Sequence, residues 1–231
     1  NEFDTVVVQS GGYFYVTGYD NGNTCNSIDD PGCYDDYGVT LDVTSLDVQV
    51  GGVVSANGRG YASGRGPSPS INGYPAPGSA HGGYGGGSNG NHGTPYGSVY
   101  EPSMMGSGGS NGNAGGGAVK IEADTLTLNG EISADGTSSI TNATGASGGS
   151  VWIEVGTISG TGTGTITADG SWGGWSSAAG GRIAIYYDDD QIDIGSQLAS
   201  HKVHAYVGAP NWPGGPGTVY VEEVGVDPAE G

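Results

Sequence analysis

The sequence predicts an all-β protein built as a parallel β-helix, and three observations lead to that prediction. The chain of 231 residues contains 50 Gly, yet its apolar residues are gathered in short β-branched runs. No stretch of a dozen residues keeps apolar side chains at helical spacing without a Gly interrupting it. Five short segments instead alternate apolar and polar residues at period two, and they recur along the chain. A β-sandwich or jelly roll is the alternative fold.

The first expected element is a pair of strands over residues 4–9 and 13–16, which we predict to cap the repeats that follow. They belong to an N-terminal segment, residues 1–37, that also contains both cysteines. Cys25 and Cys33 enclose a short turn-rich loop that a disulfide would clamp. Such a pair, in an acidic chain poor in Lys, favours an exported protein located outside the cell or at its surface.

The repeated unit is expected over residues 38–223. Each copy begins with two alternating apolar residues, which are Val39 and Leu41, Val119 and Ile121, Val151 and Ile153, Ile183 and Ile185, and Val219 and Val221. Stacked in register, these side chains would form two inward columns with rungs about 4.8 Å apart. Residues between them would face outward, which places Lys120 beside Trp152 for a cation–π contact. Asp42, Glu122 and Glu154 would stack as like charges, which requires solvation or a bound cation.

A recurrent turn follows the second strand of the first three copies, at residues 55–58, 133–136 and 167–170, and residues 203–208 take its place in the fourth. The Asn-Gly or Asp-Gly pair in it suits a tight turn. The segments after these turns should therefore leave from one edge and gather into one face. The longest, a Gly-rich insertion over residues 59–116, contains several tyrosines and is expected to pack on the repeats. Residues 224–231 are interpreted as a tail or linker.

Glycine pairs introduce the repeated strands, at Gly116-Gly117, Gly148-Gly149 and Gly180-Gly181, with Gly215 and Gly217 before the last one. In this the chain resembles the glycine-rich parallel β-helix modules of large secreted prokaryotic surface proteins, including adhesin-like ones. The resemblance implies a right-handed β-solenoid. It implies no single activity, because such modules occur in adhesins, in matrix proteins and beside polysaccharide-degrading domains.

Aromatic residues are frequent in the segments that should gather into one face. The candidate ligand-binding residues are Trp172, Trp175, Trp212, Tyr84 and Tyr96. Aromatic rings with polar backbone around them suit a sugar ring or a protein partner. The alternative interpretation is that these rings pack the Gly-rich loops against the coils.

Hard oxygen ligands are concentrated around the cysteines. The candidate Ca²⁺ ligands are Asp20, Asn23, Asp29, Asp30, Asp35 and Asp36. Simple solvated acidity is the alternative, and the acidic run at residues 188–193 is a weaker candidate of the same kind. His201 and His204 are three residues apart, which on a strand places them on opposite faces and argues against a zinc site.

The net charge of −19 argues against a nucleic acid partner, because phosphate binding requires Lys and Arg. No apolar run is long enough to span a membrane, so we expect no membrane insertion. We therefore predict an extracellular, non-catalytic structural or adhesive module that can associate with itself in filaments or matrix and can bind a glycan or another cell-surface ligand. A carbohydrate-binding module is the first alternative. A polysaccharide lyase or glycoside hydrolase is the second, since 24 acidic residues offer many carboxylate pairs while no nucleophile motif is present.

Overall fold

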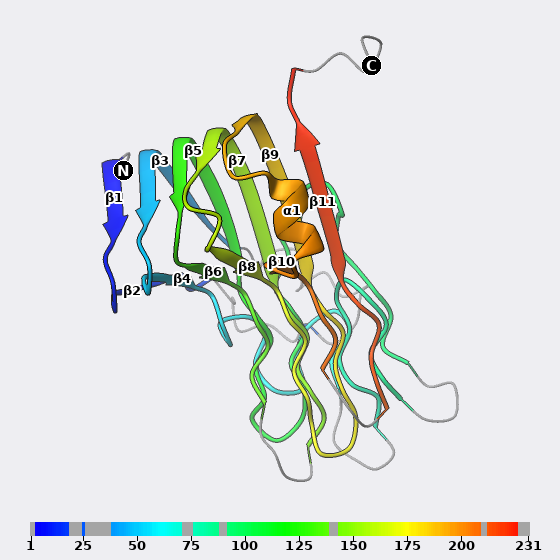
Figure 1. The fold of residues 1–231 in the computed structure, drawn as a ribbon. Coiled ribbons are helices and arrows are strands. Elements are labelled where there is room, and N and C mark those ends of the chain that lie inside the picture. The colour runs from blue at the N-terminus through cyan, green and yellow to red at the C-terminus, as the bar shows by residue number, and fades with distance from the viewer. Residues whose placement is uncertain are drawn as a thin grey trace.

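The computed structural model describes residues 3–18, 25, 38–70, 76–87, 92–138, 143–208 and 212–225. It is a parallel β-solenoid of about five turns, which confirms the predicted fold class. The solenoid has two sheets whose strands follow one another along its axis (Figure 1). One sheet has six strands in the order β1-β3-β5-β7-β9-β11, and the other has five in the order β10-β8-β6-β4-β2.

The strands of the six-stranded sheet are β1 (Phe3–Val8), β3 (Val39–Val48), β5 (Ala118–Leu128), β7 (Ser150–Ser159), β9 (Arg182–Asp190) and β11 (Thr218–Glu223). Those of the five-stranded sheet are β2 (Tyr13–Tyr15), β4 (Val53–Ser55), β6 (Glu131–Ser133), β8 (Thr165–Thr167) and β10 (Val203–His204). All neighbouring strands pair in parallel, as expected when each coil lies on the one before.

The predicted vertical register of the repeats is confirmed. Val39 pairs with Val119, Val119 with Val151, Val151 with Ile183, and Ile183 with Val219. The three central members of this column are buried, as are the central members of the next column. Fully burying an aliphatic side chain of this size contributes roughly 1.5–3 kcal/mol, so the inward columns supply the main stabilisation of the solenoid.

The two N-terminal strands form the first turn of the solenoid. β1 pairs in parallel with β3, where Val8 lies beside Val48, and β2 pairs with β4, where Phe14 lies beside Val54. The repeat thus continues into the segment that was expected to lie outside it. The sequence conceals this because Val6, Val7 and Val8 do not alternate with polar residues.

One short helix, α1 (Ile194–Ala199), connects β9 to β10 and was not expected. It begins where the Asp190 carboxylate accepts hydrogen bonds from the backbone N–H groups of Ile192 (3.0 Å) and Ile194 (2.7 Å). Asp193 then accepts from the N–H of Ser196 (3.2 Å), as an N-cap does. Both isoleucines are buried in the core, so α1 fills the corner of the fifth coil and the acidic run serves as its cap.

The Gly-rich segments extend side by side from one edge of the solenoid (Figure 1). We call them the glycine layer, which comprises residues 57–70, 76–87, 92–117, 135–138, 143–149, 169–181, 205–208 and 212–217. Successive donors of one segment bond to different neighbours: Ser79 N–H donates to Gly145 O (3.4 Å), and Gly82 N–H donates to Gly180 O (2.9 Å). A strand in a sheet has at most two neighbours, so this layer is a bundle of extended segments held by backbone hydrogen bonds.

Candidate functional site

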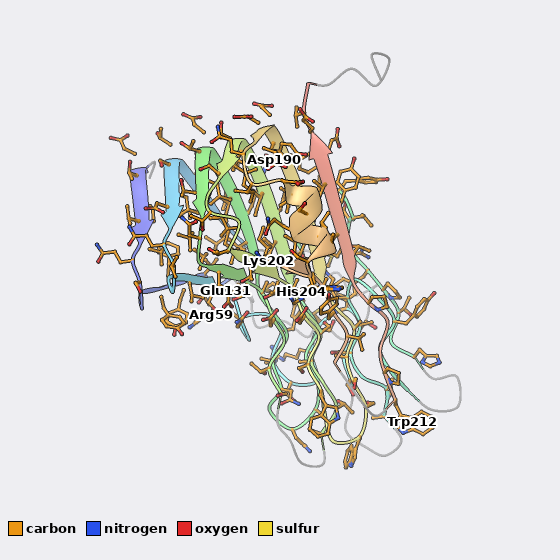
Figure 2. All side chains as sticks on the ribbon, in the orientation of Figure 1. Arg59, Glu131, Asp190, Lys202, His204 and Trp212 are labelled. Carbon is orange, nitrogen blue, oxygen red and sulfur yellow. The ribbon has the colours of Figure 1, made fainter. Side chains whose placement is uncertain are left out.

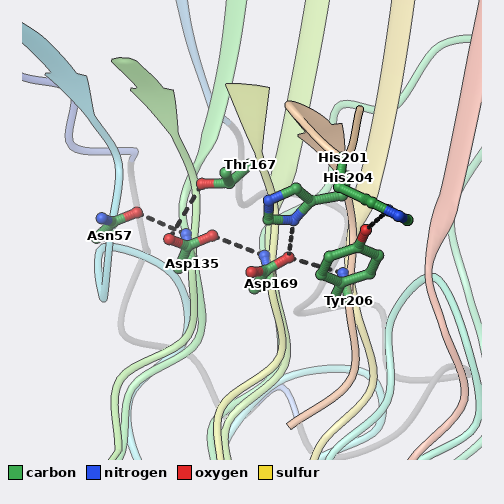
Figure 3. A network of polar contacts seen from close by, with 7 residues as sticks. All are labelled: Asn57, Asp135, Thr167, Asp169, His201, His204 and Tyr206. Atoms are coloured by element: carbon green, nitrogen blue, oxygen red, sulfur yellow. Dashed lines mark hydrogen bonds and ion pairs between the residues drawn. The ribbon is translucent and has the colours of Figure 1, made fainter. Parts of the chain in front are cut away.

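A ladder of polar side chains runs along the solenoid where the short strands end (Figure 3). Asn57, Asp135 and Asp169 occupy equivalent positions in successive coils and are called the Asx ladder below. Asp135 N–H donates to Asn57 Oδ1 (2.6 Å), and Asp169 N–H donates to Asp135 Oδ1 (2.7 Å). Tyr206 N–H continues the series by donating to Asp169 Oδ1 (2.7 Å). Each side chain therefore fixes the main chain of the next coil.

The ladder ends in an aromatic cluster on the fifth coil. His204 Nδ1 lies 2.9 Å from Asp169 Oδ1, and its ring stacks on Tyr206 with centroids 4.1 Å apart. The Tyr206 hydroxyl contacts Nδ1 of His201. The two histidines are thus joined through a tyrosine, and no group of three or more His, Cys, Asp and Glu among the described residues is placed to hold a metal ion.

The two carboxylates of the ladder differ in their surroundings. Burial raises the pKa of Asp135 to about 6, and the negative charge of Asp169 adds to this, while the hydrogen bond from Asp169 N–H opposes it. A carboxyl group with a raised pKa is typical of the general acid in catalysis on sugars. Here, however, Asp135 Oδ1 accepts from the main chain and Oδ2 from Thr167 Oγ1 (3.1 Å). The arrangement is therefore best explained as one that binds coil to coil.

The outer face of the six-stranded sheet carries the predicted contact between Lys120 and Trp152. Lys120 Nζ lies 3.8 Å from the Trp152 ring centroid. It also lies 2.5 Å from a carboxylate oxygen of Glu122 and 2.9 Å from one of Glu154. The lysine thereby relieves the repulsion that the stacked carboxylates were expected to suffer.

Three tyrosines form a second cluster on this face. Tyr100 and Tyr220 meet edge to face with centroids 4.8 Å apart, and Tyr186 lies 5.7 Å from Tyr220. The Tyr186 hydroxyl donates to the carbonyl of Tyr100 (2.8 Å). A groove of about 370 Å³ beside them is lined by Glu154, Tyr186 and Asp188, among others. The repeat predicts the outward position of the two strand tyrosines, but nothing in the sequence signals that Tyr100 crosses from the insertion to join them.

The candidate ligand-binding residues differ in their exposure to solvent. Tyr84 is 61% exposed and Trp212, labelled in Figure 2, is 50% exposed. The carbonyl of Tyr84 accepts from Gly215 N–H (2.6 Å), so Tyr84 and Trp212 lie on neighbouring segments of the glycine layer. Trp172 and Trp175 are half-buried. Tyr96 is only 3% exposed, so its ring is not available to a ligand.

Tyr96 belongs to a buried polar cluster that sequence reasoning missed. Its ring stacks on His81, and its carbonyl accepts from Arg182 Nε (2.8 Å). Burial lowers the pKa of His81 to about 3, so the ring is neutral, and its Nδ1 lies 2.8 Å from Gly148 O. The cluster ties the Gly-rich insertion to the coils.

The predicted calcium site falls on residues that lie outside the described part of the chain. These are Asp20, Asn23, Asp29, Asp30, Asp35 and Asp36, and Cys33 also lies outside it. The calcium site and the disulfide therefore stay predictions. Cys25 is described and is buried in a small cluster with Tyr61, Met105 and Ala118.

Both sheets end on edge strands, which are β1 and β11 in one sheet and β2 and β10 in the other. The N-terminal edges are apolar and exposed, since Val7 is 46% and Phe14 36% exposed, and Tyr13 and Tyr15 are exposed as well. An edge strand presents unpaired N–H and C=O groups, which can pair with a strand of another chain. These edges are the part of the described structure with the clearest capacity for an interaction.

Comparison with known proteins assigns no family: no family model, no curated protein and no solved structure matches the chain. The resemblance to secreted β-helical modules is thus supported at the level of architecture. The one helix of the described residues, α1, is far too short to cross a bilayer.

Proposed function

We propose that the chain is an extracellular, non-catalytic structural and adhesive module that associates with copies of itself. The observation that carries the proposal is the exposed, apolar edge formed by β1 and β2 on a solenoid with a continuous core. Open strand edges are the usual sites of β-augmentation, in which main-chain hydrogen bonds supply affinity. Natural monomers protect such edges with charge, proline or a covering segment.

The remaining features agree with a structural role. The Asx ladder, the aliphatic columns and the glycine layer all join one coil to the next. A net charge of −19 keeps such a module soluble. Calcium bound by the acidic segment around the cysteines belongs to this proposal as the ion that would neutralise part of that charge.

Light scattering and electron microscopy across a range of protein concentrations test the proposal, with calcium and with a chelator. We expect the mean mass to rise with concentration. Val7→Lys and Phe14→Lys should each reduce association, because a charge on an edge strand opposes pairing. Val50→Lys is the matched control, since Val50 is exposed in a turn between β3 and β4. Monodisperse monomers under every condition would reject self-association.

Carbohydrate recognition is a second candidate, favoured by Tyr84 and Trp212, which are both exposed on neighbouring segments of the glycine layer. Exposed rings of this kind stack on the apolar faces of sugars. A glycan array probed with the chain and with its Tyr84→Ala and Trp212→Ala variants tests it. Equal binding by all three proteins would rule out this surface.

A further inference from the structure

We infer that the chain pairs with a second copy of itself through its N-terminal face, with β1 lying antiparallel to β1 of the other copy. The N-terminal face is defined as β1, β2 and the turn between them, residues 3–15. The inference rests on the proposed self-association and states which ends of the solenoid meet.

The N-terminal face is apolar and carries few charges, and its one described cation is Arg59, whose guanidinium lies 4.4 Å from the Tyr15 ring centroid and donates to Thr17 Oγ1 (2.8 Å). Asp4 is the only charged residue between positions 3 and 18, in a chain with 24 Asp and Glu. Val7, Phe14 and both tyrosines of β2 are exposed on it. The outer edges of β1 and β2 pair with no other strand in the described part of the chain. This face therefore offers main-chain groups and apolar surface without the repulsion that the rest of the molecule would exert on another copy.

The opposite end of the solenoid has a different character. Residues 188–190 are three consecutive aspartates, and Asp193, Glu222 and Glu223 lie nearby in the sequence of the last coils. The Asp190 carboxylate already accepts two backbone hydrogen bonds at the start of α1. β11 pairs with β9 as far as Tyr187, and Val224 N–H donates to Tyr187 O (2.7 Å), so the edge of β9 that has no partner strand in the described part of the chain is formed by Asp189 and Asp190.

Head-to-tail stacking would bring unlike surfaces together. The pairings of successive coils place Asp4 in the same column as Asp188, and Val6 in the same column as Asp190. At this end Val224 N–H donates to Tyr187 O (2.7 Å), so Val224 already lies beside Asp188 in that column. A second copy that continued the solenoid would therefore have only Asp189 and Asp190 of β9 to pair with. It would also set the half-buried Val6 beside a carboxylate that is engaged in capping α1.

Pairing of two N-terminal faces avoids both conflicts. An antiparallel pair centred on Val6 places Asp4 opposite Val8 of the other copy and Thr5 opposite Val7. Each of these contacts occurs twice, and a two-fold axis through Val6 relates the two occurrences. The interface is therefore isologous and closes after two copies. The inference therefore predicts pairs of chains rather than open filaments.

Single cysteines test the arrangement directly. Residues opposite one another on antiparallel strands have Cβ atoms about 4.5–5.5 Å apart, close to the separation that a disulfide bridges. We expect a mixture of Thr5→Cys and Val7→Cys chains to give a covalent dimer on oxidation, whereas either chain oxidised alone should give much less, because only Thr5 and Val7 lie directly opposite one another. An Asp189→Cys chain on β9 is the matched control, because Asp189 is exposed and lies in the same column as Thr5, and it should not crosslink to itself or to them. The unsubstituted chain provides the background from the native cysteines.

Each other result has a defined meaning. Crosslinks that join Thr5→Cys only to Asp189→Cys would show head-to-tail stacking, which overturns this inference and leaves self-association standing. Light scattering that finds only monomers, with no crosslink, overturns both. As a second measurement, Val7→Lys should weaken dimerisation by at least about tenfold, whereas Tyr220→Lys should change it by less than about twofold. Equal weakening by the two variants would overturn the inference as well.

Discussion

At the scale of single residues, the Asx ladder has an asparagine in one coil and an aspartate at the equivalent position of the next coil. Asn57 and Asp135 make the same hydrogen bond to the next coil through Oδ1, so the bond itself needs an oxygen acceptor and no charge. Asp135 adds an ionised carboxylate in a site where burial raises its pKa to about 6. A carboxyl with a raised pKa in the folded state favours the protonated form there, so its ionisation costs stability.

Asp135→Asn should consequently stabilise the protein above pH 6. The pKa difference between the unfolded value near 3.8 and the folded value near 6 sets an upper limit of about 3 kcal/mol, and partial exposure makes about 1–2 kcal/mol the expected gain. The gain in stability should shrink as the pH falls through 6 and vanish near pH 4, because the Asp135 carboxyl of the folded protein is then protonated and as neutral as the asparagine. Urea unfolding at several pH values measures it.

Asp169→Asn is the control for this prediction. Asp169 accepts from Tyr206 N–H and also contacts His204, so its charge has a partner that Asp135 lacks. The substitution should not stabilise the protein at any of the pH values tested, because it removes one oxygen acceptor from this contact. A stabilisation of similar size in both variants would show that the net charge of the chain, and not the site, is responsible.

At the scale of elements, the glycine pairs before the strands are explained by close contacts between backbones. A Cβ on Gly148 would lie 2.1 Å from the carbonyl oxygen of Ala168, and the equivalent Gly116 and Gly180 face the carbonyls of Ala134 and Ala205 in the same way. The absence of a side chain at the first glycine of each pair thus allows the backbone of the next coil to approach closely. As at the axis of collagen, only a residue without a side chain fits where extended segments approach so closely.

Gly148→Ala should therefore destabilise the protein by more than about 3 kcal/mol, since backbone atoms of a neighbouring coil would have to move. Gly195→Ala is the matched control. Gly195 lies in α1, where the added Cβ would meet no atom closer than 3.4 Å, and alanine favours a helix over glycine by about 0.5–1 kcal/mol. Thermal unfolding of the two variants compares them, and similar losses in both would contradict the close-packing explanation.

The elements that the sequence predicts well are those with a periodic signal. Alternation in the segments at Val119, Val151 and Ile183 predicts both the strands and their register, because only one alignment buries every aliphatic residue. The glycine layer has no period of this kind, so its neighbours are set by backbone contacts that leave no trace in residue type. This is why the burial of Tyr96 and its contact with Arg182 could not be foreseen.

The candidate site was predicted less well than the fold. Outward positions such as Lys120 and Trp152 follow from register alone, and their contact was expected. The exposure of a side chain in the loops depends instead on which loop segment packs over it, and that packing is set by backbone contacts within the glycine layer. α1 was missed because its six residues are shorter than the window in which helical spacing can be recognised, although the Asp193 cap is visible in the sequence.

At the scale of the whole molecule, the solenoid and the glycine layer are two parts of the same coils. From the second coil on, the chain passes from the long strand to the short strand and then through the glycine layer before the next coil begins. Backbone bonds such as Gly116 N–H to Ser147 O (3.0 Å) join successive coils within the layer. Neither part can unfold while the other keeps all of its contacts.

We therefore predict a single cooperative unfolding transition, which the four tryptophans can report separately. Trp152 lies on a sheet strand, whereas Trp172, Trp175 and Trp212 lie in the glycine layer. Fluorescence of the Trp152→Phe variant follows the layer, and fluorescence of a variant that retains only Trp152 follows the sheet. Each should give the same urea midpoint as circular dichroism recorded on the same variant, because coincident probes define a two-state transition. If the layer signal changes at a lower urea concentration than the sheet signal, the glycine layer is a separate unit that the coils only support.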